Sequence, residues 1–191
     1  MSQPDRFLVL THGAGSNASS PLLLAVAKAF KDANYFVLRY DLPFRQARPL
    51  GPPFPVNAAQ DRAGLESAVR TMRERANGRP VILGGHSYGG RQSSMLAAEK
   101  PDLVDALLLL SYPLHPPRKP EQLRTAHLPD LRTPALFVHS TRDPFGSPEE
   151  MRQAIALIPA RTGFVEVERA GHDLAPLKWT ARAVAALGEL I

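Results

Sequence analysis

One serine is flanked by glycines in a pattern that suits a nucleophile. Residues 84–90 read Gly-Gly-His-Ser-Tyr-Gly-Gly, which places Ser87 in G-x-S-x-G between an apolar strand-like run and a helical segment. A sharp strand-to-helix turn brings the neighbours two residues either side almost into contact, and Gly85 and Gly89 have no side chains to clash there. The turn would raise the Ser87 hydroxyl at a helix N-terminus, which favours negative charge. The alternative is a glycine-rich turn in which Ser87 only caps the helix.

A serine hydroxyl needs a base to take its proton, and the chain has six histidines. In open parallel sheets the site lies at the carboxyl ends of the strands, so the base should directly follow a strand. His172 does so in Ala-Gly-His-Asp (residues 170–173) and is the predicted general base. His86, next to the serine, is expected to point away into packing. His12 lies in the loop after the first strand and His139 ends a strand, so both are weaker candidates. His115 and His127 lie in a long loop, where surface positions are expected.

The base must also be oriented, normally by a carboxylate that accepts the proton of its other ring nitrogen. Asp143 lies in Thr-Arg-Asp-Pro-Phe-Gly (residues 141–146), after the serine and before the histidine in the chain. Asp173 is the alternative, but a residue next to His172 cannot easily turn its carboxylate onto the far nitrogen of that imidazole. We therefore predict Asp143 as the orienting acid, which completes a catalytic triad.

Acyl transfer to a serine also requires two amide donors for the oxyanion of the tetrahedral intermediate. The residue after the nucleophile normally gives one, here the Tyr88 amide. The loop Thr-His-Gly-Ala-Gly (residues 11–15) supplies the other, through the Ala14 amide or alternatively that of Gly13. Taken alone, this loop could also be a glycine turn suited to a phosphate group.

Apolar, β-prone segments alternate with longer helical ones, as in successive β-α-β units. The sequence predicts strands at 7–11, 35–40, 80–84, 104–111, 134–139 and 163–168, and helices at 19–31, 57–77, 87–100, 148–157 and 177–191. Proline interrupts both kinds of element, so the proline-rich segments 41–56 and 112–129 are expected to be loops. The predicted fold class is α/β, with a six-stranded, mostly parallel sheet.

Length and charge restrict the class of protein. The 191 residues fit one domain, predicted to span residues 1–191. Lys and Arg outnumber Asp and Glu by 23 to 18, but the basic residues are scattered, so no nucleic-acid partner is expected. No apolar run approaches the roughly 20 residues of a membrane span. A polar N-terminus and the lack of cysteine favour a cytoplasmic location.

With these motifs in place, the sequence resembles the α/β-hydrolase superfamily over essentially its full length. More narrowly, it resembles the small group related to testis-expressed protein 30, the NSL-complex subunit 3 and dienelactone-hydrolase-like proteins. The likeness is carried by residues 11–15 (THGAG), 85–90 (GHSYGG), 111–117 (SYPLHPP), 141–146 (TRDPFG) and 171–172 (GH). It implies a three-layer core without the two leading strands and the cap of larger members. Dienelactone hydrolases use a cysteine nucleophile, whereas this chain has no cysteine.

These residues together predict a serine esterase that cleaves a small carboxylic ester or thioester through an acyl-enzyme at Ser87, with no cofactor or metal. The alternatives are acyl transfer by the same triad and a non-catalytic interaction module, although a scaffold needs neither a triad nor the turn glycines. The expected partner is a small-molecule ester, selected by the loops 41–56 and 112–129. The sequence indicates neither the identity of the substrate nor the oligomeric state.

Overall fold

The computed structural model describes residues 3–191 and contains a six-stranded sheet in the order β2-β1-β3-β4-β5-β6. All five strand pairings are parallel, so the predicted fold class is confirmed. The strands are β1 (Arg6–Thr11), β2 (Tyr35–Tyr40), β3 (Val81–His86), β4 (Ala106–Leu110), β5 (Ala135–Ser140) and β6 (Thr162–Val167). The helices are α1 (Pro21–Asp32), α2 (Pro43–Ala47), α3 (Asn57–Ala76), α4 (Tyr88–Glu99), α5 (Pro148–Ile155) and α6 (Thr180–Gly188), with a 3-10 turn η1 (Leu128–Asp130).

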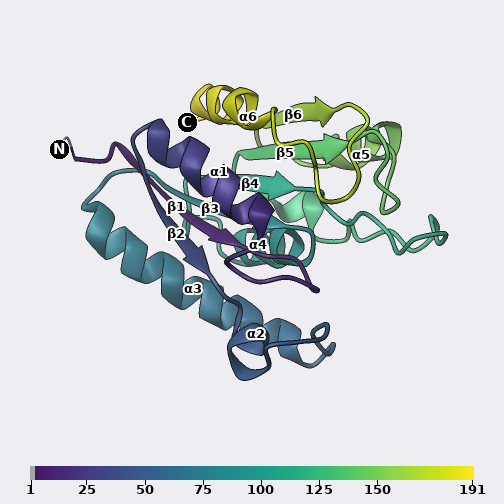
Figure 1. Ribbon diagram of the computed structural model, residues 1–191, viewed down its shortest axis with the longest axis horizontal. Coiled ribbons are helices and arrows are strands. Elements are labelled where there is room, and N and C mark those ends of the chain that lie inside the picture. The colour runs from purple at the N-terminus through teal and green to yellow at the C-terminus, as the bar shows by residue number, and fades with distance from the viewer. Residues whose placement is uncertain (1–2) are drawn as a thin grey trace.

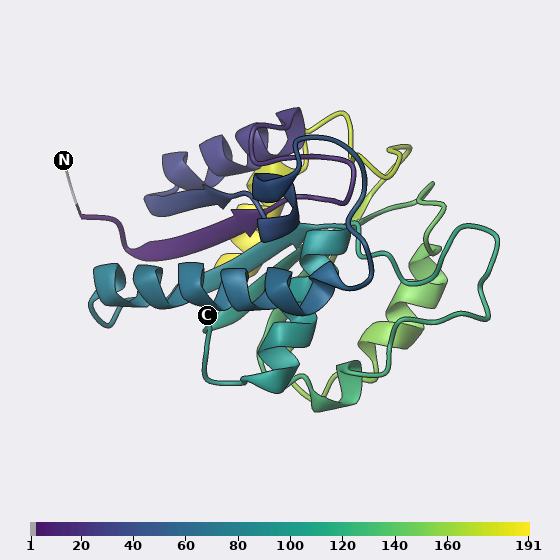
Figure 2. The ribbon, with the colours of Figure 1, turned by 90° about the horizontal axis from the view of Figure 1, so that it is seen from below.

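Helices cover both faces of the sheet, which gives three layers (Figure 1). Figure 2 shows α1 on one side of the strands and α3 on the other. The apolar side chains of α1 and α6 pack in one cluster, and those of α3, α4 and α5 pack in a second cluster. Because β4 is covered on both faces, its run of one alanine and four leucines is buried throughout, as is typical of a central parallel strand.

Side-chain caps begin two of the predicted helices. The Ser20 side chain accepts a hydrogen bond from the Leu23 amide at the start of α1. Ser147 and Glu150 bond each other's backbone amides in a capping box at the start of α5. This capping box lies just beyond the turn that carries Asp143.

Two of the predicted segments need correction. The segment 41–56, expected to be a loop, contains the short helix α2. Pro43 lies in the first turn of α2, where amides have no intrahelical acceptor and the missing proton is therefore harmless. The last helix begins at Thr180 rather than residue 177, because the chain before it forms a loop closed by a hydrogen bond from Trp179 Nε1 to the Leu174 carbonyl oxygen.

The direction in which strands are added reverses at β1. The chain adds β2 on one side of β1 and then returns to add β3 on the other. Loops that leave the carboxyl ends of β1 and β3 therefore diverge, and the crevice between them is the usual ligand site of an open parallel sheet. Residues 12–15 follow β1 and Ser87 follows β3, so both predicted parts of the site lie at this point.

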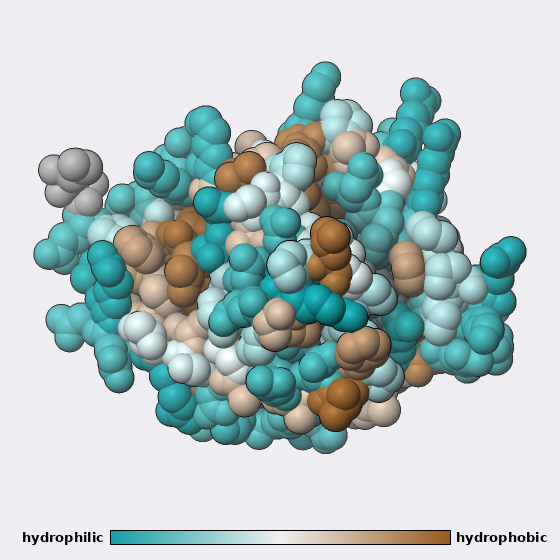
Figure 3. All heavy atoms as spheres, turned by 60° about the horizontal axis from the view of Figure 1, so that its bottom comes forward, coloured by the Kyte–Doolittle hydropathy of each residue, from teal (hydrophilic) through white to brown (hydrophobic). Residues whose placement is uncertain are grey.

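The surface carries apolar residues in small groups among hydrophilic side chains, as Figure 3 shows for one face. Leu50, Phe54 and Val56, which follow α2, are among the exposed large apolar residues. Of the helices within residues 3–191, none has the length and apolar character needed to cross a bilayer.

Candidate active site

Ser87 occupies a strained turn between β3 and α4. Its φ of +50° and ψ of −116° form a backbone conformation that residues other than glycine rarely adopt. A β-carbon on Gly85 would lie 2.5 Å from the carbonyl carbon of Gly89. A β-carbon on Gly89 would lie 2.5 Å from the carbonyl oxygen of His12. The sharp turn predicted from the glycine spacing is therefore present, and backbone contact excludes larger residues at both positions.

Ser87, His172 and Asp143 form a continuous hydrogen-bonded series. Nε2 of His172 lies 2.8 Å from Oγ of Ser87, and Nδ1 of His172 lies 2.8 Å from Oδ2 of Asp143. The three residues come from the loops after β3, β6 and β5. Parallel strands end at one edge of the sheet, which explains how residues far apart in the chain meet here.

Asp143 has the environment of an ionised acid. Its side chain is fully buried, and its Oδ1 accepts a hydrogen bond of 2.9 Å from the Phe145 amide. Burial by itself would raise the pKa of the Asp143 carboxyl, but the hydrogen bonds from His172 and from the Phe145 amide hold that pKa below its ordinary value. An ionised Asp143 accepts the proton on Nδ1 of His172, which leaves the lone pair of Nε2 directed at the Ser87 hydroxyl.

Two neighbours hold the His172 residue. The Phe145 ring centroid lies 4.4 Å from that of His172. His86 is largely buried, as expected, but it does not point away from the site, because its Nε2 lies 2.9 Å from the His172 carbonyl oxygen. A carbonyl oxygen only accepts, so Nε2 of His86 is the donor. Burial lowers the pKa of His86 to about 4, which keeps the ring neutral.

Asp173, the alternative acid, instead accepts a hydrogen bond of 3.2 Å from the Ala175 amide of its own loop. The expectation that His115 lies at the surface is wrong. Its loop packs against α5, so its side chain is buried, with Nδ1 2.8 Å from the Pro116 carbonyl oxygen and Nε2 3.6 Å from Glu150. The remaining histidines bond elsewhere: His127 to Ser94 Oγ, His139 to the Gly146 carbonyl oxygen and His12 to that of Gly13.

The peptide between Gly13 and Ala14 has a defined orientation. The Leu42 amide donates to Nε2 of His12 at 3.1 Å, so the ring proton is on Nδ1, which donates to the Gly13 carbonyl oxygen at 2.9 Å. The Ser16 amide also donates to that oxygen, at 3.1 Å. In a trans peptide the amide proton points opposite to the carbonyl. The Ala14 amide therefore points away from His12, which favours Ala14 over Gly13 as the oxyanion donor.

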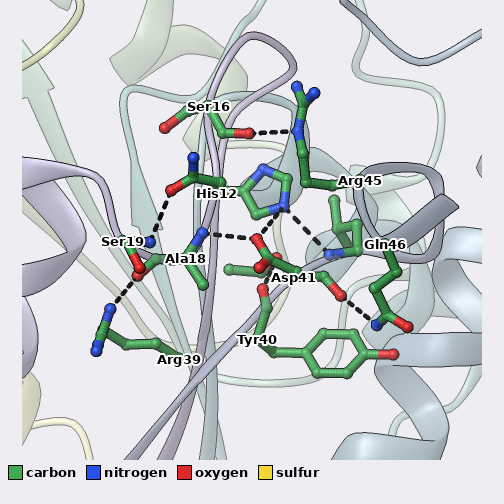
Figure 4. A network of polar contacts seen from close by, with 12 residues as sticks. His12, Ser16, Ala18, Ser19, Arg39, Tyr40, Asp41, Arg45 and Gln46 are labelled. Carbon is green, nitrogen blue, oxygen red and sulfur yellow. Dashed lines mark hydrogen bonds and ion pairs between the residues drawn. The ribbon is translucent and has the colours of Figure 1, made fainter. Parts of the chain in front are cut away.

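A buried arginine that the sequence analysis missed holds the same loop. Arg45 of α2 donates from Nε to Ser16 O at 2.8 Å and from Nη2 to Ala14 O at 2.9 Å and Gly51 O at 3.0 Å. Nη1 donates to Arg48 O at 3.2 Å. Figure 4 shows Arg45 reaching Ser16 beside His12. The guanidinium thus ties the loop after β1 to the segment after α2; the proline-rich sequence around it gave no signal of this.

Tyr88 begins α4, and its amide belongs to the first helical turn, where amides have no acceptor within the helix. Its side chain is anchored, because the hydroxyl donates to Oδ2 of Asp61 at 2.7 Å and the ring packs edge-on against Phe44. Burial, together with Asp61, raises the pKa of the Tyr88 hydroxyl, which stays a neutral donor.

A cavity of about 440 Å³ opens beside Ser87 and is bordered by both Ala14 and Tyr88. One wall is the proline-rich segment 52–55, and Phe145 contributes to another. The polar lining residues, which the sequence analysis also missed, are Arg91, Gln92 and Arg124. A larger hollow of about 640 Å³ beside Arg73 and Lys100 is not lined by Ser87, Asp143 or His172. Within residues 3–191, no group of three or more His, Asp or Glu side chains is arranged to hold a metal ion.

Comparison with known proteins assigns the fold to a family. The sequence profile of the alpha/beta hydrolase domain matches residues 4–187. The chain belongs to the alpha/beta hydrolase family. This match spans both the Ser87 turn and the His172 loop.

Solved structures of several other proteins are similar in fold. A dienelactone hydrolase from Anabaena variabilis superimposes with a TM-score of 0.75 at 20% identity, over 98% of this chain and 85% of that one. A monoacylglycerol lipase from Paleococcus ferrophilus gives 0.74 at 16% identity, over 98% and 94%. Est1E from Butyrivibrio proteoclasticus gives 0.73 at 15% identity, over 98% and 87%. At these identities the likeness concerns the fold alone.

Proposed function

We propose that this alpha/beta hydrolase is a serine hydrolase that cleaves a small carboxylic ester or thioester through an acyl-enzyme at Ser87. The hydrogen-bonded series from Ser87 through His172 to Asp143 carries the proposal. The strained turn at Ser87 and the cavity beside it support it further.

In the acylation step, Oγ of Ser87 attacks the ester carbonyl carbon while Nε2 of His172 takes the hydroxyl proton. Asp143 keeps the imidazole in the required tautomer and stabilises the imidazolium that forms. The amides of Ala14 and Tyr88 bind the oxyanion of the tetrahedral intermediate, where each donor is worth about 3–4 kcal/mol in a preorganised site. The intermediate collapses when His172 returns the proton to the leaving alcohol or thiol.

Deacylation repeats these steps with water. His172 takes a proton from the water, the hydroxide attacks the acyl carbon, and Ser87 leaves with the proton that His172 returns. A cavity that is open beside Ser87 admits water once the alcohol has departed.

The finer sequence predictions belong to the same proposal. The narrower likeness to testis-expressed protein 30 and its relatives agrees with the connection between β4 and β5, in which η1 is the one helical element assigned within residues 111–134. A serine nucleophile favours ordinary esters or thioesters over dienelactones. A small-molecule ester as partner, a cytoplasmic location, a single domain over residues 1–191 and independence from cofactors remain predictions.

Paired acid variants test the proposal against its alternatives. With 4-nitrophenyl butyrate and S-phenyl thiobutyrate as substrates, Asp143→Asn should lower kcat by about 10³- to 10⁴-fold, since a neutral amide cannot stabilise the imidazolium and its NH2 group favours the wrong tautomer of His172. The matched variant Asp173→Asn should change kcat less than about twofold, because the Asp173 carboxylate accepts a hydrogen bond from the Ala175 amide of its own loop rather than from His172.

Three results would contradict the proposal. A wild-type chain that turns over neither substrate favours a non-catalytic module. A rate that requires an added alcohol acceptor favours acyl transfer. Equal losses in the two variants would remove Asp143 from its role.

A further inference from the structure

The charged residues that line the cavity beside Ser87 are basic. Its lining includes two arginines, Arg91 and Arg124, and none of the lining residues in the described part of the chain is acidic. Prolines 52, 53 and 55 with Phe54 and Phe145 make much of the remaining wall apolar. Positive charge in a partly apolar cavity is unfavourable unless an anion compensates it.

Arg91 lies one helical turn from the nucleophile. Its amide donates to the Ser87 carbonyl oxygen at 2.9 Å, and Ser87 directly precedes α4, so the two residues are joined across the first turn of the helix. Arg91 and Ser87 line the same cavity. Nε of Arg91 is buried and has no hydrogen-bond partner within residues 3–191.

Arg124 approaches the cavity from the segment between β4 and β5. It is half-buried, its Nη1 donates to Pro113 O at 3.2 Å, and its amide donates to Leu114 O at 2.8 Å. Burial lowers the pKa of Arg124, and the positive charge of Arg91 lowers it further. The two cations therefore repel one another inside the molecule.

Within residues 3–191, no carboxylate offsets this pair. In the part of the chain that the structure describes, neither Arg91 nor Arg124 takes part in an ion pair. The Asp61 carboxylate, which lies beside Tyr88, already accepts hydrogen bonds from the Phe44 amide and the Tyr88 hydroxyl. The cavity is thus left with two uncompensated positive charges.

Gln92 adds a third donor. It is fully buried, and its Oε1 accepts a hydrogen bond of 3.0 Å from Nη1 of Arg62. Its Nε2 is buried without a partner among residues 3–191. Buried donors of this kind are normally satisfied, so their number at one cavity indicates that an acceptor is missing.

We propose that the substrate carries a carboxylate or phosphate group, which Arg91 and Arg124 bind in the cavity while the ester carbonyl lies at Ser87. This inference rests on the proposed function, because it names the substrate class of the same site. Guanidinium groups bind planar carboxylate and tetrahedral phosphate groups with paired hydrogen bonds. The one-turn spacing of Arg91 from Ser87 suits a short linker between the ester and the anion.

The first test compares two esters of equal chain length. Mono-4-nitrophenyl adipate carries a free carboxylate, and methyl 4-nitrophenyl adipate does not. The ratio of their kcat/KM values, anionic over neutral, should exceed about ten in the wild type. It should fall roughly ten- to hundredfold in Arg91→Met and in Arg124→Met, which lose charge-assisted hydrogen bonds. Arg132→Met, which removes an exposed arginine, is the control and should keep the wild-type ratio. A wild-type ratio near one, or a ratio that neither cavity variant changes, overturns the inference.

The second test does not depend on turnover. Adipate and phenyl phosphate are titrated by calorimetry into Ser87→Ala chains with and without Arg91→Met or Arg124→Met. Loss of anion binding in either arginine variant supports the inference. The anion with the lower Kd shows whether the cavity prefers a carboxylate or a phosphate group. Absence of binding by both anions overturns it. If an anion binds in this way but the wild type hydrolyses neither ester, the proposed function fails while the anion site stands.

Discussion

Gly89 and His12 touch through their backbones, since a β-carbon on Gly89 would lie 2.5 Å from the His12 carbonyl oxygen. This contact joins the turn that carries Ser87 to the loop that carries Ala14. Ser87 and one proposed oxyanion donor therefore cannot move independently. Preorganised donors of this kind are what lowers the barrier in acyl transfer.

We expect Gly89→Ala to destabilise the protein by about 2 kcal/mol or more, because backbone atoms cannot yield to the added methyl group. Gly15→Ala is the matched control, since a β-carbon there meets no atom within 4 Å. Its free energy of unfolding should differ from that of the wild type by less than about 0.5 kcal/mol. Urea unfolding of both variants measures the difference, and equal stabilities would contradict the contact.

The strain at Ser87 should be visible in stability. The positive φ of Ser87 carries a local cost of about 1–3 kcal/mol, which glycine escapes, whereas the added flexibility of the unfolded chain offsets only about 0.4–1 kcal/mol. Ser87→Gly should therefore be at least as stable as the wild type in urea. Ser67→Gly, at an exposed position inside α3, should instead lose about 0.5 kcal/mol. A Ser87→Gly chain clearly less stable than the wild type would argue against strain at residue 87.

Arg45 should act as a positioning residue for the oxyanion loop. Lysine offers a single ammonium in place of a planar fork, so Arg45→Lys cannot reproduce the bonds to Ser16, Ala14, Gly51 and Arg48. We expect kcat for 4-nitrophenyl butyrate to fall roughly ten- to hundredfold with KM changed less than about twofold. Arg132→Lys, at an exposed position, should leave both constants unchanged. A loss of stability with an unchanged kcat would show that Arg45 supports the fold alone.

Buried histidines should make the protein less stable in mild acid. Burial, with help from Arg91, lowers the pKa of His127 to about 4 in the folded state, against 6.5 for an ordinary histidine. Between these values the unfolded chain binds more protons, so the stability contributed by a neutral His127 is complete above pH 6.5 and is lost as pH falls toward 4. The stability contributed by a neutral His86 is lost over the same pH range, because burial also lowers the pKa of His86 to about 4.

The measurement is the free energy of unfolding at pH 7 and pH 5. His127→Gln, which cannot titrate, should lose about 1–2 kcal/mol less than the wild type between these two values. Identical losses in the two chains would mean that His127 is not held neutral.

The hydrogen-bonded series of Ser87, His172 and Asp143 was predictable because its signals are local. The glycines around Ser87, the turn residues around Asp143 and the position of His172 after a strand each follow from short segments. Parallel topology then places the ends of those strands at one edge of the sheet, so their order in the chain sufficed to bring the three residues together.

Other parts of the site depend on contacts that no local pattern encodes. Arg45 acts through four carbonyl groups of loops whose path proline-rich sequence leaves open, and Arg124 lies in another such segment. The helix α2 was missed for the same reason. Arg91 is different, since its spacing of four residues from Ser87 on a predicted helix could have placed it beside that serine.

Covalent labelling by a fluorophosphonate tests the central claim most directly, because the reagent reacts with a serine hydroxyl only when a base and an oxyanion site activate it. After incubation of the wild type, Ser87→Ala and His172→Gln with the reagent, tryptic peptides are analysed by mass spectrometry. We predict one phosphonylated serine, Ser87, in the wild type, no label in Ser87→Ala, and labelling slowed by at least about a hundredfold in His172→Gln. A label on another serine, or equal labelling of all three chains, would contradict the account.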